Sequence, residues 1–186
     1  MNNDEKFIKI SISGDLGSGK STVCNYLKER YGLKVFSTGQ IQRSLAQRHN
    51  MDVLAFNKFM ESHPEIDGEI DAELVKLGRR NEDMVLDSRM AWHFVPDSFK
   101  VYLTVDIDEA ARRVMKDQRG EVEKYASADA AKASLAERKK SENLRYINKY
   151  GVDCSNLDNY DLVIDTTNIS PGEVAEIIMS EYRQRG

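Results

Sequence analysis

A short stretch near the start of the chain has the residue types and spacing of a phosphate-binding loop. The sequence GDLGSGKS matches the pattern G-x-x-x-x-G-K-[ST] at Gly14, Gly19, Lys20 and Ser21. Glycines let the backbone wrap closely around an anion, so that successive N–H groups point at phosphate oxygens. The lysine adds a charge toward the outer phosphates, and the serine hydroxyl suits Mg²⁺. The pattern therefore predicts a P-loop that binds a nucleoside triphosphate.

The expected contacts to the triphosphate extend over the whole loop and into the next helix. They comprise Gly14, Asp15, Leu16, Gly17, Ser18, Gly19, Lys20, Ser21 and Thr22. A guanine-binding switch protein would also need the motif N-K-x-D. The two candidates, NKFM at 57–60 and NKYG at 148–151, both lack the aspartate. The sequence therefore does not favour a GTPase.

Alternating strand and helix patterns surround this loop. Short apolar runs at 7–13, 33–37, 83–88, 100–105 and 160–166 are typical of strands covered on both faces. Helical spacing is present at 20–32, 40–49, 63–80, 108–117, 128–149 and 170–184, and Asp52 could begin a further short helix. This order predicts an α/β fold of three layers, with a five-stranded parallel sheet between helices. Ligands of such sheets bind at the carboxyl ends of the strands.

Composition limits the remaining possibilities. The chain has 186 residues and a formal net charge of −4, which argues against a protein that coats nucleic acid. It has no apolar run long enough to cross a bilayer, and its first residues do not resemble a signal peptide, so we expect a cytosolic location without membrane contact. Cys24 and Cys154 lack metal-ligand or redox spacing. The oligomeric state is left open, with a monomer slightly favoured.

Seven segments together resemble the cytidylate kinases, in particular the short, archaeal-type branch of these P-loop nucleoside monophosphate kinases. They are ISGDLGSGKST, VFSTGQIQRSLA, HPEIDGEID, VLDSRMAW, VYLTVDIDEAARRV, ERKKSENLRYINKYGVD and YDLVIDTTNISPGEV, spread from about residue 7 to 180. The resemblance implies a single domain over 1–186, with a core of 1–37, 81–118 and 151–186. It also implies a helical monophosphate-binding insert at about 38–80, and a lid at about 117–130 followed by a helix to 150. The implied reaction is phosphoryl transfer from ATP to CMP or dCMP, with Mg²⁺.

The resemblance also assigns the acceptor side of the site. The residues expected to contact the monophosphate are Thr38, Arg43, Arg89, Arg138, Glu142 and Arg145. The last three have offsets of four and three, which place them on one face of a helix. On spacing alone that segment could equally be a solvated helix face. A phosphate acceptor needs fixed positive charge more than a general base, and this fits the number of arginines.

On the donor side, the resemblance implies three catalytic residues and a metal site. Lys20, Arg89 and Arg119 are expected to be catalytic, Arg112 and Arg113 to contact ATP phosphates, and Ser21 and Asp87 to hold Mg²⁺. Met90 stands where many members of that family have an aspartate that contacts the base, so the sequence supports phosphoryl transfer better than the choice of base. Three alternatives remain: a P-loop kinase of another monophosphate, a kinase of a small hydroxyl compound, with Asp87 as general base, and a nucleotide-binding protein without turnover.

Overall fold

The computed structural model describes residues 7–51, 56, 59–60, 62–116 and 125–185. Within them, five strands form one parallel sheet in the order β2-β3-β1-β4-β5. The strands are β1 (Lys9–Gly14), β2 (Lys34–Ser37), β3 (Met84–Asp87), β4 (Phe99–Thr104) and β5 (Leu162–Asp165). The predicted five-stranded parallel sheet is therefore confirmed, and the strand that precedes the P-loop lies at its centre.

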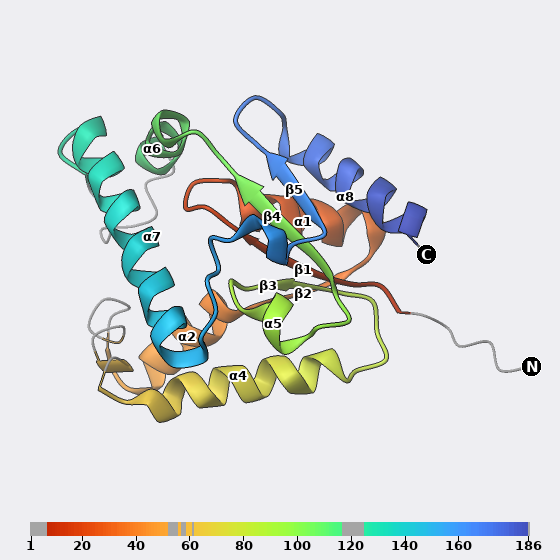
Figure 1. Cartoon of the computed structure of the whole chain (residues 1–186), viewed down its shortest axis with the longest axis horizontal. Helices are drawn as coiled ribbons and strands as arrows, with labels where there is room; N and C mark the ends of the chain where they lie inside the picture. Colours follow the sequence, from red (N-terminus) through yellow and green to blue (C-terminus); the bar gives the residue numbers. More distant parts are fainter. Residues whose placement is uncertain (1–6, 52–55, 57–58, 61, 117–124, 186) are drawn as a thin grey trace, which may run out of the picture.

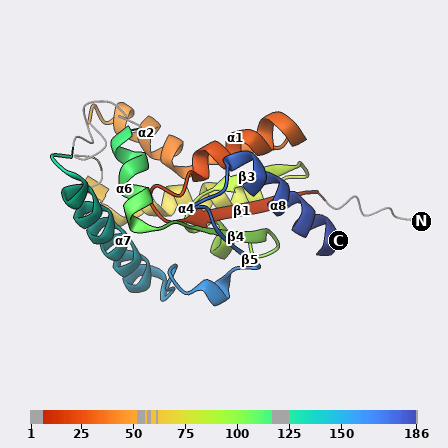
Figure 2. The same cartoon turned by 90° about the horizontal axis from the view of Figure 1, so that it is seen from above.

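Helices cover both faces of this sheet (Figures 1 and 2). They are α1 (Lys20–Tyr31), α2 (Thr38–Arg48), α4 (Pro64–Gly78), α5 (Ala91–Phe94), α6 (Ile107–Lys116), α7 (Ala128–Tyr150) and α8 (Pro171–Arg185). One face packs against α1 and α8 in the largest apolar cluster. The other face packs against α4, α5 and the segment after α7. Figure 2 places α1 and α7 on opposite sides of the sheet.

Alternation along β1 explains why this strand is buried on two sides. Ile10 and Ile12 of β1 point into the cluster beneath α1 and α8. Ser11, between them, points to the other face, where it accepts a hydrogen bond from Ser98 over 2.9 Å. Because successive side chains of a strand face opposite sides of the sheet, both layers of helices contact β1. The central strand is thus held rigidly, together with the loop that follows it.

Helices α2 and α4, from the expected insert, share a small apolar cluster of their own. Ala46 of α2 packs there with Ile66 and Ile70 of α4 and with Phe56 and Met60, all of them buried. The separate cluster is consistent with an insert at about 38–80, although the division of the chain into core, insert and lid stays a prediction.

Three local features differ from the sequence predictions. Helix α2 begins at Thr38 rather than at about residue 40. Helix α5 and a short 3₁₀ helix at Leu157–Asn159 were not predicted, because three or four residues are too few to show helical periodicity. The helix expected from Asp52 falls mostly outside the described residues. No helix among the described residues is long and apolar enough to span a membrane, and the cytosolic location stays a prediction.

Candidate functional site

The carboxyl ends of three neighbouring strands bring the expected site residues together. Asp87, the last residue of β3, is in register with Ile12 of β1 and with Ser37 of β2. The P-loop follows β1 directly, and Thr38 follows Ser37. Because parallel strands end at one edge of the sheet, the P-loop, Asp87 and Thr38 lie beside one another.

The P-loop is fixed from outside by bonds to its backbone. The Asp15 N–H donates to the Leu103 carbonyl over 2.9 Å, and the Ser18 N–H donates to the Asp15 carbonyl over 3.2 Å. Gly17 has φ +83°, and a Cβ there would lie 2.9 Å from Ala110 of α6. Within the described part of the chain, the N–H groups of Gly17 and Gly19 have no hydrogen-bond partner. These donors and the N-terminus of α1 are therefore open to an anion.

Lys20, Ser21 and Asp87 form a polar cluster at the start of α1. The Lys20 ammonium pairs with the Asp87 carboxylate, and the Ser21 hydroxyl lies 3.4 Å from the other oxygen of that carboxylate. Asp87 is only 5% exposed, so its charge depends on these partners. A hydroxyl and a carboxylate are hard oxygen ligands of the kind that Mg²⁺ prefers, since it takes few protein ligands and fills its shell with water and phosphate. The residues present therefore fit Mg²⁺.

A pocket lies between the P-loop, Arg89 and α7, and its lining includes Asp15, Arg89, Tyr102, Glu142 and Tyr146. Arg89 Nη1 is 2.5 Å from Glu142 Oε2. Burial opposes the charge on Arg89, but the Glu142 carboxylate, with smaller contributions from Tyr146 and Tyr102, outweighs it and raises the pKa of the guanidinium. The pocket thus contains a permanent positive charge, which is held by a carboxylate in the absence of ligand.

The three expected residues of α7 lie on the helix face that packs against the protein. Arg138, Glu142 and Arg145 are half-buried and continue the line of the buried Ala131 and Leu135. Arg145 also donates to the hydroxyl of Tyr146 over 3.4 Å. This face is therefore not simply a solvated surface, although the contacts of these residues with a nucleotide stay predictions.

The other expected acceptor contacts lie on α2. Thr38 is its first residue and is half-buried, whereas Arg43 is exposed. Neither belongs to the described residues that line the pocket at Arg89. Within the described residues, Arg43 forms no ion pair, so its guanidinium is available to a ligand. Their contact with the monophosphate stays a prediction.

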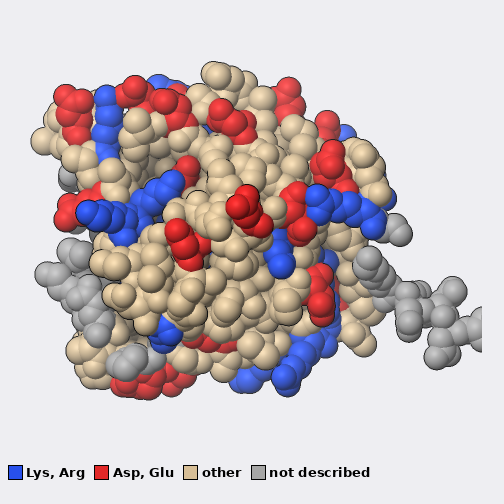
Figure 3. Space-filling model, in the orientation of Figure 1, with Lys and Arg blue, Asp and Glu red and all other residues tan. Residues whose placement is uncertain are grey.

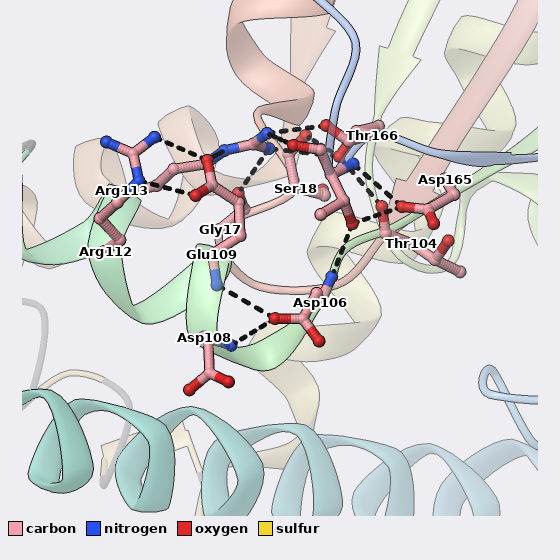
Figure 4. Close-up of polar contacts among 11 residues, drawn as sticks. Gly17, Ser18, Thr104, Asp106, Asp108, Glu109, Arg112, Arg113, Asp165 and Thr166 are labelled. Carbon is pink, nitrogen blue, oxygen red and sulfur yellow. Dashed lines mark hydrogen bonds and ion pairs between the residues drawn. The ribbon is translucent and has the colours of Figure 1, made fainter.

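Two of the three arginines expected near ATP lie within the described residues, and they differ in their contacts. Arg112 is mostly exposed and forms two bonds with Glu109, of 2.6 and 2.7 Å. Arg113 is half-buried and donates to backbone carbonyls, including those of Gly17 and Thr166 (Figure 4). Arg119 lies outside the described residues, as does the lid segment 117–124. Of the two described arginines, Arg113 therefore reaches the P-loop, and it does so through main-chain atoms.

Several contacts of the P-loop were not predicted from the sequence. Tyr102 of β4 donates to Asp15 Oδ1 over 2.8 Å, and Lys139 of α7 lies 2.6 Å from the same atom. Burial, followed by the charge of Asp15, raises the pKa of Tyr102, so its hydroxyl stays a donor near neutral pH. The sequence signal for Tyr102 was a hydroxyl-bearing residue in the middle of an apolar strand. Thr166, whose hydroxyl lies 3.0 Å from the Ser18 carbonyl, had no signal other than its position just after the last strand.

The MAWHF segment packs rather than forming an exposed aromatic surface. Trp92 is 7% exposed and clusters with Tyr102, Cys154 and Tyr160, while the buried Met90 contacts the sulfur of Cys154. The structure thus places Trp92 in an apolar cluster and not on a surface open to a base.

Acidic and basic side chains are interspersed on the face that Figure 3 shows, and no continuous basic surface covers it. Among the described residues, no group of three or more His, Cys, Asp or Glu side chains could hold a metal ion. The expected Mg²⁺ site at Ser21 and Asp87 needs no such group, because Mg²⁺ commonly takes only one or two protein ligands.

A P-loop after the central strand of a parallel sheet, beside a pocket with a second fixed cation, defines a P-loop kinase. The chain belongs to the cytidylate kinase-like family, whose model matches residues 9–168. Cytidylate kinase of Methanobrevibacter smithii is 34% identical over 174 residues, which cover 94% of this chain and 98% of that protein.

Two further relatives mark the range of the similarity. An S-adenosylmethionine-dependent nucleotide dehydratase of Lacinutrix mariniflava is 32% identical over 177 residues, which are 95% of this chain but 36% of that longer protein. Shikimate kinase from Acinetobacter baumannii, solved with shikimate, superposes with a TM-score of 0.63 at 16% identity, over 97% of this chain and 96% of that one. At this identity the likeness concerns the fold alone.

Proposed function

We propose that this chain transfers the γ-phosphoryl group of ATP to CMP or dCMP and releases ADP and the nucleoside diphosphate. The observation that carries the proposal is that the site holds two separate cations, Lys20 at the P-loop and Arg89 in the adjoining pocket. Each of them forms an ion pair with a carboxylate. A kinase with a phosphate acceptor has two anions to bring together, so it needs a cation for each. Membership of the cytidylate kinase-like family supports the same reaction.

ATP is the donor, and its phosphates lie in the P-loop. The open N–H groups of Gly17 and Gly19 and the N-terminus of α1 hold the phosphate oxygens. Lys20 leaves Asp87 and follows the γ-phosphate, where it offsets the charge that develops during transfer. Ser21 and Asp87 hold Mg²⁺, which when bound neutralises phosphate charge. Asp87 thus has a partner both with and without nucleotide.

The acceptor monophosphate lies beside Arg89. Its dianion takes the place of the Glu142 carboxylate on the guanidinium, and Glu142 turns to the sugar together with Arg138 and Arg145. Thr38 and Arg43 hold the phosphate from the side of α2. A phosphate monoester is already largely ionised near neutral pH, because its second pKa is about 6, so no general base is required. The described site accordingly needs no histidine for the reaction.

A panel of acceptors tests this proposal. Purified full-length chain with ATP and Mg²⁺ is assayed for ADP release with CMP, dCMP, UMP, AMP, GMP, shikimate and gluconate. We expect the fastest turnover with CMP or dCMP. Turnover on shikimate or gluconate that equals or exceeds that on CMP would favour a hydroxyl acceptor, and binding of ATP without turnover on any acceptor would favour a nucleotide-binding protein. Lys20→Met, purified in the same way, controls for contaminating kinases.

A further inference from the structure

All N–H donors of the Arg113 guanidinium form hydrogen bonds within the protein. Its Nε donates to Glu109 Oε1 over 2.7 Å. Its Nη1 donates to the Gly17 carbonyl and to Thr166 Oγ1, both over 3.3 Å, and its Nη2 donates to the carbonyls of Thr166 and Thr167 over 2.7 and 3.2 Å. A guanidinium has about five N–H donors. In this geometry all of them are engaged, so none is left for a phosphate.

The bond to Gly17 controls which way the P-loop backbone faces. In a trans peptide unit the carbonyl and the next residue's N–H point in opposite directions. With the Gly17 carbonyl held outward by Arg113, the Ser18 N–H points inward across the loop, where it donates to the Asp15 carbonyl over 3.2 Å. Arg113 therefore stabilises the internal bond that closes the turn.

Thr166 extends this control to the next peptide. Its hydroxyl is buried, with the residue 2% exposed, and lies 3.0 Å from the carbonyls of Ser18 and Thr104. Because Arg113 Nη1 donates to this hydroxyl oxygen, the hydroxyl proton is directed away from the guanidinium and toward those carbonyls. A Ser18 carbonyl held in this way turns the Gly19 N–H toward the anion. Figure 4 shows this chain of bonds from α6 through Thr166 to the loop.

Packing and charge keep Arg113 in this orientation. Gly17 lies so close to Ala110 on the same helix that a Cβ at Gly17 would be 2.9 Å from it. Glu109 accepts from Arg113 and Arg112 together, and their hydrogen bonds lower the pKa of its carboxyl to about 2. The carboxylate is therefore ionised throughout the neutral range, and α6, the P-loop and the start of the loop after β5 form one connected unit.

We propose that Arg113 is a positioning residue for ATP, which acts through the P-loop backbone instead of touching the phosphates. It holds the Gly17 carbonyl directly, which supports the internal bond from the Ser18 N–H to Asp15. It holds the Ser18 carbonyl through Thr166, which keeps the Gly19 N–H turned to the anion. The proposal rests on ATP as the ligand of the P-loop. It does not depend on which acceptor the enzyme uses.

Binding of ATP to the full-length chain, measured by calorimetry with Mg²⁺, tests this role. We expect Arg113→Met to weaken ATP binding about tenfold or more, because it removes charge-assisted bonds to the loop. Arg113→Lys retains one donor group that can reach one carbonyl, so we expect an intermediate value. Lys116→Met removes a positive charge from the exposed last turn of the same helix and is the matched control, which we expect to bind ATP as the unaltered chain does.

A second pair of variants tests the relay without changing charge. Thr166→Val removes the hydroxyl and should weaken ATP binding several-fold, whereas Thr166→Ser keeps the hydroxyl and should bind ATP normally. If Arg113→Met does not fold, the comparison of these two Thr166 variants tests the positioning role instead. In Arg113→Met and Thr166→Val we expect KM for ATP to rise while KM for CMP stays within about twofold.

Two results would overturn the proposal. One is that Arg113→Met, or Thr166→Val in its place, binds ATP as well as the unaltered chain. The other is that a variant loses affinity for ATP and for CMP to the same extent and also has a lower thermal midpoint. That result would mean that the hydrogen bonds of Arg113 and Thr166 only support the fold. An enzyme that binds ATP but does not phosphorylate CMP would contradict the proposed function alone, and the comparison of ATP affinities would still stand.

Discussion

At the scale of single residues, the site keeps its cations in place by pairing them with carboxylates. Lys20 is held by Asp87, and Arg89 by Glu142. A long basic side chain loses rotamer entropy when a ligand fixes it, and a partner that already orders it reduces that loss. The ligand must then replace a carboxylate, which favours a dianionic phosphate over a singly charged group.

Removing an arginine of the acceptor side should separate the two substrates. We expect Arg43→Ala and Arg138→Ala to raise KM for CMP about tenfold or more, through the loss of a charge-assisted bond of about 1.5 to 3 kcal/mol. KM for ATP should stay within a few fold, because these residues belong to α2 and α7 and not to the P-loop. Steady-state kinetics with each substrate varied in turn measures both constants. An equal rise in both would show that these arginines support the structure instead.

The two cysteines should be unreactive in the folded protein. Cys24 and Cys154 are 1% and 6% exposed, and burial raises the pKa of both thiols from 9.0 to about 11. The folded state therefore binds these protons more tightly, so their contribution to stability is complete below about pH 9 and is lost as the pH rises toward 11. We expect iodoacetamide at pH 8 to modify both thiols only after unfolding, as read by mass spectrometry. Rapid labelling of the native chain would contradict this.

The sequence can indicate which residues lie together where the candidate site is contiguous, while their contacts with ATP and Mg²⁺ stay predictions. The P-loop residues belong to one loop, and Asp87 ends the strand that pairs with the strand before this loop. Tyr102 and Lys139 contact Asp15 from positions that are far away in the chain, and no local pattern reports such a contact. The sequence indicated that Arg113 lies near the P-loop but not which groups it contacts, because a basic side chain can donate to a phosphate or to a carbonyl equally well.

At the scale of elements, α7 connects α6, the P-loop, Arg89 and α4. Figure 1 shows α7 running from α6 to the region of α2 and α4. Along it, Lys132 pairs with Asp108 of α6, Lys139 with Asp15 of the P-loop, and Glu142 with Arg89. At its end, Tyr150 donates to Asp71 of α4 over 2.5 Å. A single rigid helix with ties at successive turns can transmit a shift at one substrate to the other.

Two glycines with similar backbone angles should respond differently to alanine. Gly17 has φ +83° and lies against Ala110, whereas Gly32, at the end of α1, has φ +72° and open space where a Cβ would lie. Gly32→Ala should cost about 1 kcal/mol of unfolding free energy through left-handed strain and leave ATP binding intact. Gly17→Ala adds a steric clash, so we expect a larger loss of stability and little ATP binding. Denaturant unfolding and ATP titration of both variants measure this; equal effects would contradict it.

The bounds of helices were predicted best where hydrophobic periodicity or a capping residue was clear in the sequence. Helix α8 begins at Pro171, next to the start of the predicted range 170–184, because Ser170 accepts from the Glu173 N–H over 3.3 Å and its own N–H donates to the Glu173 carboxylate. Helix α2 begins earlier than predicted because Thr38 follows β2 without any linker. Sequence spacing does not show where a strand turns directly into a helix.

At the scale of the whole molecule, a ligand that binds the folded chain should raise its stability by an amount set by the ratio of ligand concentration to Kd. We expect CMP at about 100 times its Kd to add about 2.7 kcal/mol, which corresponds to a thermal midpoint about 5 to 10 °C higher for a chain of this size. Cytidine at the same concentration should produce little shift, because it offers Arg89 no anion. Differential scanning calorimetry compares the two. If cytidine stabilises the chain as much as CMP does, the phosphate is not what the pocket holds.

The central place of β1 has a consequence for synthesis of the chain. The loop's sequence leaves the ribosome before the residues that support it, Leu103, Arg113 and Thr166. Strands that pair in parallel must wait for distant partners, so this region folds late. A nascent chain that ends before Thr166 contains the complete motif and still lacks the scaffold that shapes it. Nucleotide capture should therefore begin only after Thr166 has been translated.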